Sequence, residues 1–233
     1  MRTFRLETHF MPLKSGLLFI LLSFAFSGCF DLVEEVNLHA DGSGTFGFAA
    51  NLSQSKIKLQ TILALDSLDG YKIPSKEQIS REFEKAVRIL EKSEGISHVS
   101  DKIDFDNYIF GLNFSFTQVK FLNLALADLH KSFTNGKPLP ANNGFRQEGK
   151  TFERLSEYKA PKEMKSAAKK DITVLNEAFL TCIYRFDRNI SSFSNPDAKL
   201  SKNGKAVLLK ISIPDLISGT KTIANTIQTK TEP

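Results

Sequence analysis

The sequence predicts an α+β fold, in which a largely antiparallel sheet of about six or seven strands has helices packed on one face. Segments in which apolar and polar residues alternate come mostly in pairs, and segments of helical periodicity lie between those pairs. Strands that follow one another closely along the chain pair in the antiparallel sense. With 41% hydrophobic residues and 20 phenylalanines, the chain can form a substantial core.

The N-terminal residues 1–28 have the three parts of a secretory signal peptide. Basic residues (Arg2, Arg5, Lys14) precede the uncharged apolar block Gly16–Phe26, and the small residues Ser27 and Gly28 follow it. The block is too short for a transmembrane helix, which needs about 20 apolar residues. Met11 is a possible alternative start, which would give a more compact signal.

Residues Ala25 to Cys29, with a small residue directly before the cysteine, resemble the lipobox of bacterial lipoproteins. The resemblance implies cleavage before Cys29 and lipidation of its thiol, although Phe26 stands where leucine is common. It also implies a protein anchored by acyl chains to a membrane of the bacterial cell envelope, more often the outer one, and facing the periplasm. The alternative is a core cysteine that ends a buried helix.

The mature chain, 29–233, is predicted to be a single α+β domain that begins with a β-hairpin close to the membrane. Leu32, Val36 and Leu38 alternate with polar residues, although Glu34 interrupts the pattern. The turn Asp41–Gly44 then precedes a second alternating segment. Spacing around this turn also resembles a calcium loop, but Phe48 stands where that loop needs glutamate.

Two helices and a strand are predicted in the next segment. Ser53–Leu65 has helical character, and Ser75 with Gln78 forms a capping box before a helix that Gly95 ends. The strand 108–116 has one aromatic face, and Thr117 is predicted to cap a helix that runs to about Ser132.

The C-terminal half is predicted to begin with an irregular loop at 134–144, which is rich in glycine, proline and asparagine. A strand near Phe145–Leu155 and a helix near Pro161–Glu177 follow. Leu180–Phe186 and Val207–Ile213 alternate as strands, and the tail after Asn225 is expected to fray.

No catalytic or metal-binding pattern stands out, so we predict neither an enzyme nor a cofactor. His39, His98 and His130 have no metal-ligand spacing. With Cys29 lipidated, Cys182 has no disulfide partner, and its apolar neighbours predict a place in the core. Serine and lysine in S-x-x-K spacing recur along the chain, as expected by chance, for example at Ser53/Lys56, Ser55/Lys58, Ser166/Lys169 and Ser218/Lys221.

Basic residues are too dispersed for a nucleic-acid-binding protein. The net charge is +5, and about +3 without residues 1–28. The predicted helix near 161–177 carries a basic stripe, which is either a solvated face or a contact for anionic lipid headgroups (Lys162, Lys165, Lys169, Lys170).

These observations predict a non-enzymatic, membrane-anchored lipoprotein that acts as a binding or scaffolding module for another envelope protein or a lipid. A second hypothesis is a carrier or chaperone for lipids or outer-membrane components, in which the aromatic strand Tyr108–Phe116 lines an apolar pocket. An open cavity beside this strand would favour the carrier, and a filled interior the scaffold. A serine hydrolase is a third alternative, which would need a polar cluster around Ser53 or a histidine.

Overall fold

The computed structural model describes residues 30–63, 65, 67–68, 71–134, 136–140, 142–156 and 178–231. The predicted signal peptide, Cys29 and the predicted helix Pro161–Glu177 lie outside these residues.

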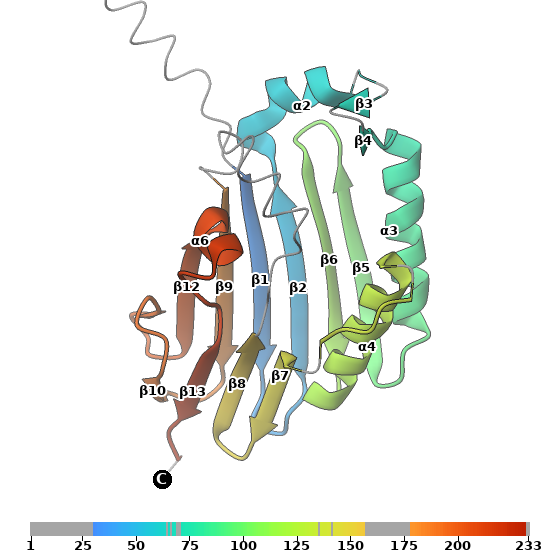
Figure 1. The fold of residues 1–233 in the computed structure, drawn as a ribbon. Coiled ribbons are helices and arrows are strands. Elements are labelled where there is room, and N and C mark those ends of the chain that lie inside the picture. Colours follow the sequence, from blue (N-terminus) through green and yellow to red (C-terminus); the bar gives the residue numbers. More distant parts are fainter. Residues whose placement is uncertain are drawn as a thin grey trace, which may run out of the picture.

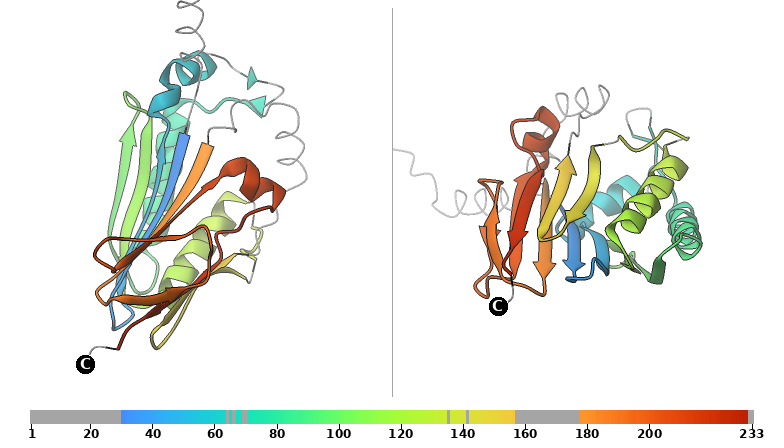
Figure 2. Two further views of the ribbon diagram at one scale, coloured as in Figure 1. Left: turned by 90° about the vertical axis from the view of Figure 1, so that its left-hand side faces the viewer. Right: turned by 90° about the horizontal axis from the view of Figure 1, so that it is seen from below.

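The predicted fold class is confirmed, because a seven-stranded sheet has helices and further strands packed on one face (Figures 1 and 2). Along the sheet every neighbouring pair is antiparallel except β9 and β1, which are parallel. The strands, in order across the sheet, are β11 (Lys199–Leu200), β12 (Ala206–Ser212), β9 (Ala178–Phe186), β1 (Phe30–Leu38), β2 (Gly44–Asn51), β6 (Ile109–Phe116) and β5 (Ile96–Asp104).

A second, four-stranded antiparallel sheet was not expected. It consists of β10 (Ile190–Phe193), β13 (Asn225–Thr229), β8 (Thr151–Ser156) and β7 (Asn143–Glu148). The segment predicted as one strand near Phe145–Leu155 is the hairpin of β7 and β8, because Gly149 at φ +59° allows the chain to turn. The tail predicted to fray after Asn225 is β13, whose Ile227 is fully buried.

The described residues form four α-helices and a short 3₁₀ helix. The 3₁₀ helix η2 (Ser53–Ser55) leads into α2 (Lys56–Leu63), where a helix was predicted. The small ribbon β3 (Ser67–Leu68) and β4 (Tyr71–Lys72) precedes α3. The other helices are α3 (Lys76–Glu91), α4 (Val119–Phe133) and α6 (Ile213–Ser218).

Two of the predicted local signals are confirmed. The turn between β1 and β2 closes through a hydrogen bond from the His39 amide to the Ser43 carbonyl, 2.8 Å long, and Gly42 has φ +87°. At α3, the Ser75 hydroxyl accepts from the Gln78 amide at 3.2 Å and Gln78 Oε1 accepts from the Ser75 amide at 2.9 Å.

The cap predicted for α4 is wrong. Gln118, and not Thr117, is the N-cap residue, and it makes no side-chain capping bond. The Thr117 amide instead donates to the carbonyl of Gly95 at 2.9 Å, which keeps Thr117 in line with β6.

The second sheet and α4 cover the seven-stranded sheet near the end that carries the β1–β2 turn (Figures 1 and 2). The strand register places side chains of four strands in rows on this covered face. One row, with exposures of 0–5%, is Val36, Phe46, Phe114 and Tyr184. In the next row, away from the turn, Phe48 is 39% exposed although Cys182 is fully buried. On this face β2 is therefore incompletely covered from Phe48 onward, whereas β9 is buried along its whole length.

Candidate ligand-binding cavity

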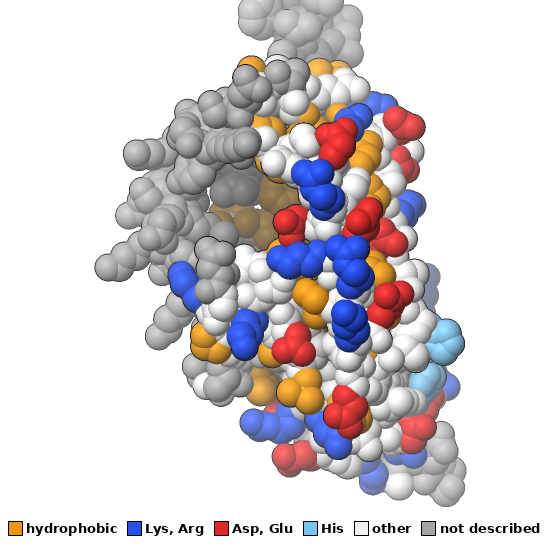
Figure 3. Space-filling model, turned by 90° about the vertical axis from the view of Figure 1, so that its right-hand side faces the viewer, with side chains coloured by type: hydrophobic (Ala, Val, Ile, Leu, Met, Phe, Trp, Pro, Cys, Tyr) orange, Lys and Arg blue, Asp and Glu red, His pale blue; other side chains and the backbone are white. Residues whose placement is uncertain are grey.

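A cavity of about 330 Å³ lies where this cover ends, between the seven-stranded sheet and α4. Its volume is within the range of small-molecule sites, about 300–1,000 Å³. The lining residues are Glu34, Phe46, Phe48, Leu112, Phe114, Leu126, Leu129, His130, Leu139, Asn143, Gly144 and Arg154. Figure 3 shows a hollow with hydrophobic side chains on the side of the molecule that carries α3 and α4.

Strand pairing and helix periodicity place the apolar part of the lining. Phe46 lies opposite Phe114 across β2 and β6, and Phe48 lies opposite Leu112. Cross-strand neighbours on one face are close enough to form a continuous wall. The facing wall comes from Leu126, Leu129 and His130, because residues three and four apart share one face of a helix.

The polar end of the cavity is a buried ion pair that joins the two sheets. Arg154 of β8 donates from Nε to Glu34 Oε1 at 2.9 Å and from Nη2 to Oε2 at 2.8 Å. The Tyr184 hydroxyl also donates to Glu34 Oε1, at 2.8 Å. The exposed fractions of the two charged side chains are 9% for Glu34 and 13% for Arg154.

Arg154 is held in place by further contacts. Its Nη1 donates to the Leu155 carbonyl at 2.7 Å and to the Gly144 carbonyl at 3.3 Å. The guanidinium lies 4.7 Å from the centre of the Phe145 ring, within cation–π distance. These contacts satisfy the charge on both sides, so the ion pair is a neutral and preorganised polar surface.

The pair also shifts the protonation of its neighbours. Burial is the largest influence on Arg154 and opposes its charge, but the charge of Glu34, the neighbouring Tyr184 and Cys182 and the hydrogen bonds to Glu34 together raise the pKa of the guanidinium. Burial, followed by the charge of Glu34, raises the pKa of the Tyr184 hydroxyl. The same two causes raise the pKa of the Cys182 thiol. Tyr184 and Cys182 are therefore uncharged at neutral pH.

An apolar wall with one neutral polar end suits a ligand that is mostly hydrocarbon. The volume has room for roughly ten methylene-sized groups at about 30 Å³ each. A charged ligand group would gain no net opposite charge from the Glu34–Arg154 pair. The chemical preference of the site is therefore for an acyl or similarly apolar chain.

The structure describes only some of the residues singled out in the sequence, and these lie in different environments. Cys29 and the four lysines of the predicted basic helix lie outside the described residues. Cys182 is fully buried in the core, as predicted. His130 lines the cavity, whereas His98 contacts the hydroxyl of Ser97 at 3.2 Å. Within the described ranges, no group of three or more possible metal ligands is found.

The S-x-x-K pair Ser218/Lys221 does not form a catalytic unit, because its two side chains bind other partners. The Ser218 hydroxyl donates to the Asp215 carbonyl at 3.0 Å, whereas Lys221 binds Asp197 at 2.8 Å. Ser166 and Lys169 lie outside the described residues.

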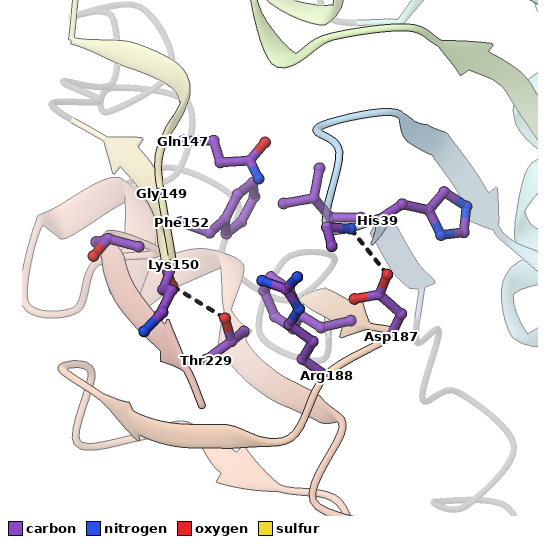
Figure 4. A pocket seen from close by; sticks show the side chains of 12 residues that line it. His39, Gln147, Gly149, Lys150, Phe152, Asp187, Arg188 and Thr229 are labelled. Carbon is purple, nitrogen blue, oxygen red and sulfur yellow. Dashed lines mark hydrogen bonds between the residues drawn. The ribbon is translucent and has the colours of Figure 1, made fainter. Parts of the chain in front are cut away.

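His39 borders a different and much smaller pocket near the β1–β2 turn (Figure 4). This pocket holds about 20 Å³, enough for roughly one water molecule. Asp187 accepts a hydrogen bond from the Ala40 amide at 2.9 Å, and the Thr229 amide donates to the Lys150 carbonyl at 3.0 Å. The His39 ring points away from Arg188 and Phe152 in Figure 4, so the pocket is a packing feature between the two sheets.

Sequence reasoning did not identify Glu34 and Arg154 as site residues. One signal was present, because Glu34 occupies a position of β1 where the alternation calls for an apolar side chain. A charged residue at a core position needs a buried partner. Its partner lies 120 residues away, and nothing in the local sequence around Arg154 marks it.

No helix in the described part of the chain combines the length and the apolar character needed to cross a membrane.

Comparisons with known proteins give one structural similarity. Neither a scan against protein-family models nor a search of curated proteins finds a match. Among solved structures, the chain is similar to the NMR structure of the folded domain of LppM from Mycobacterium tuberculosis. That match has a TM-score of 0.41 and 15% sequence identity, and covers 89% of this chain and 94% of the LppM domain.

Proposed function

We propose that this protein binds the hydrocarbon part of a lipid in the cavity between β2, β6 and α4, and acts as a lipid carrier or lipid-binding module of the cell envelope. The observation that carries the proposal is the open apolar cavity with the Glu34–Arg154 pair at one end. It favours the carrier hypothesis over a scaffold with a filled interior. The lipobox-like sequence before Cys29 supports the envelope location.

The lining supports binding without chemistry. The cavity wall contains no serine, threonine, cysteine or lysine among the described residues, so Glu34 and His130 are its side chains of nucleophilic types there. Among the described lining residues, His130 and Glu34 are of a common general-base type, and the Glu34 carboxylate is already bonded to Arg154 and Tyr184. We therefore propose that the ligand leaves the site chemically unchanged.

The expected binding free energy of an acyl chain is small enough for a reversible carrier. Burying about ten methylene groups contributes roughly 8 kcal/mol at about 0.8 kcal/mol each. Association and ordering of the chain cost at least about 4 kcal/mol. The difference is at most about 4 kcal/mol, which corresponds to a dissociation constant of about 1 mM or weaker, so the ligand exchanges readily.

The proposal is tested on residues 30–233, because every residue of the described core lies between Val36 and Ile227. Lipids that copurify from the bacterial host are extracted and identified by mass spectrometry, and binding of a fluorescent fatty acid is titrated. We expect saturable binding at one site. Leu129→Trp, which fills the cavity, should weaken it at least tenfold.

Leu124→Trp is the matched control. Leu124 lies on the same helix and is 56% exposed, outside the cavity lining. This variant should bind the probe as the unmodified protein does. If Leu129→Trp folds and binds equally well, or if the unmodified protein binds no acyl probe and copurifies with no lipid, the proposal is wrong.

A further inference from the structure

A second surface feature lies at the opposite edge of the seven-stranded sheet from β5, around β9, β11 and β12. It is a groove of about 570 Å³ that shares no residue with the lipid cavity. Among the described residues, its lining combines four cationic side chains with apolar ones and contains no acidic side chain. The cationic side chains are Arg185, Lys199, Lys202 and Lys205.

The cations are held at the surface in different ways. Lys199, Lys202 and Lys205 are exposed, and Lys205 Nζ donates to the Asp187 carbonyl at 2.7 Å. Arg185 pairs with Glu35, which is not among the residues that line the groove. Three lysine charges therefore remain without a carboxylate among the residues that line the groove.

Two large apolar side chains accompany these charges. Leu200 is 47% exposed and Leu208 is 40% exposed, and Ile183 lies directly opposite Leu208 across β9 and β12. Leucine exposed beside lysines is the composition of a surface that lies on a lipid bilayer, with apolar groups in the interface and ammonium groups among the headgroups.

We propose that this groove docks the protein on a membrane surface that contains anionic phospholipids. Charge complementarity selects the anionic headgroups, because the groove carries only positive charge. The exposed leucines favour a bilayer over an acidic protein or a nucleic acid. Single-stranded nucleic acid is bound through stacking aromatic side chains. Among the described residues that line the groove, Phe186 is the aromatic one, and it is only 8% exposed. The proposal is independent of the lipid cavity and needs no acyl chain on Cys29.

The test is flotation of residues 30–233 with phosphatidylcholine vesicles that contain or lack about one third phosphatidylglycerol. We expect binding only to the anionic vesicles, and we expect it to weaken as salt is raised. Lys199→Glu with Lys202→Glu should lower the partition coefficient at least tenfold, and Leu200→Ser several-fold. The lysines at 162, 165, 169 and 170 stay unchanged in every variant.

Lys102→Glu with Lys137→Glu is the charge-matched control, because Lys102 lies on β5 at the other edge of the sheet. This control should change the partition coefficient less than twofold, and Leu129→Trp should leave it unchanged. An equal loss in both charge-reversed pairs, or equal binding to neutral vesicles, would overturn the proposal. Binding to polyglutamate without binding to anionic vesicles would assign the groove to acidic proteins and also overturn it.

Discussion

Glu34 and Glu35 are neighbours in sequence but point to opposite faces of β1, and their environments differ accordingly. The Glu34 side chain is 9% exposed and pairs with the buried Arg154. Glu35 is 33% exposed and pairs with Arg185, which is 47% exposed. A buried charge that loses its partner is strongly destabilising, whereas a surface pair contributes little because water screens it.

Replacing Glu34 with alanine should therefore lower the free energy of unfolding by about 3–5 kcal/mol, because Arg154 is left buried without a countercharge. Glu35→Ala should lower it by at most about 1 kcal/mol. Denaturant unfolding of both variants measures the difference. The double variant Glu34→Met with Arg154→Met should recover most of the loss, and equal effects of the two single variants would contradict this account.

Cys182 lies beside Glu34 across the parallel pair of β9 and β1. Burial and the negative charge of Glu34 both raise the pKa of its thiol, so thiolate is scarce at neutral pH. We predict that a thiol reagent at pH 8 modifies Cys182 no faster than the protein unfolds, and modifies it rapidly in denaturant. Rapid modification of the folded protein would show that the thiol is accessible.

Among the secondary-structure elements, β13 shows how pairing overrides local sequence. Asn225–Thr229 contains a single large apolar residue, Ile227, and by itself carries little strand signal. Its two neighbours, β10 and β8, supply hydrogen-bonding partners on both edges. Ile227 is fully buried by this arrangement, and the Asn225 side chain accepts from the amides of Ser194 and Asn195.

Deleting residues 225–233 should therefore unfold the second sheet or reduce the midpoint of thermal unfolding strongly. The deletion removes Ile227 from the core, and loss of a large buried side chain alone costs about 2–5 kcal/mol. Removing only residues 231–233 leaves β13 whole and is the control. Thermal unfolding followed by circular dichroism compares them, and two equally stable truncations would show that β13 contributes nothing.

For the whole molecule, the main feature is that two layers of unequal length face each other. The second sheet and α4 cover the rows of the seven-stranded sheet near the β1–β2 turn, where Val36 and Phe46 are 1% and 5% exposed. Phe48, one row further along, is 39% exposed. The cavity lies at this step in coverage, and the Glu34–Arg154 pair joins the two layers beside it.

Amide hydrogen exchange should reflect this change in cover along β2 and β6. We predict slower exchange at Phe46 and Phe114 than at Ala50 and Phe110, because strands with less packed cover open at lower free energy. A bound acyl probe should slow exchange at Phe48 and Leu112, which line the cavity, more than at Ala50 and Phe110, which do not. Uniform protection that a ligand does not alter would contradict both the unequal cover and the proposed site.

The sequence by itself determined the features that depend on contiguous residues. The β1–β2 hairpin, the capping box of Ser75, the strands around Phe114 and Tyr184 and the core position of Cys182 all follow from alternation, turn chemistry and local apolar pattern. These signals arise within a few residues, so no tertiary information is needed to interpret them.

Only the tertiary structure decided how distant segments meet. The parallel pairing of β1 with β9 joins residues about 150 apart, and the Glu34–Arg154 pair joins residues 120 apart. The covering strands β7 and β8 each have six residues, whereas β1 and β9 each have nine, and on the β2 side Phe48 is left 39% exposed. The packing of distant segments decides where this cover ends, and the cavity lies at that point.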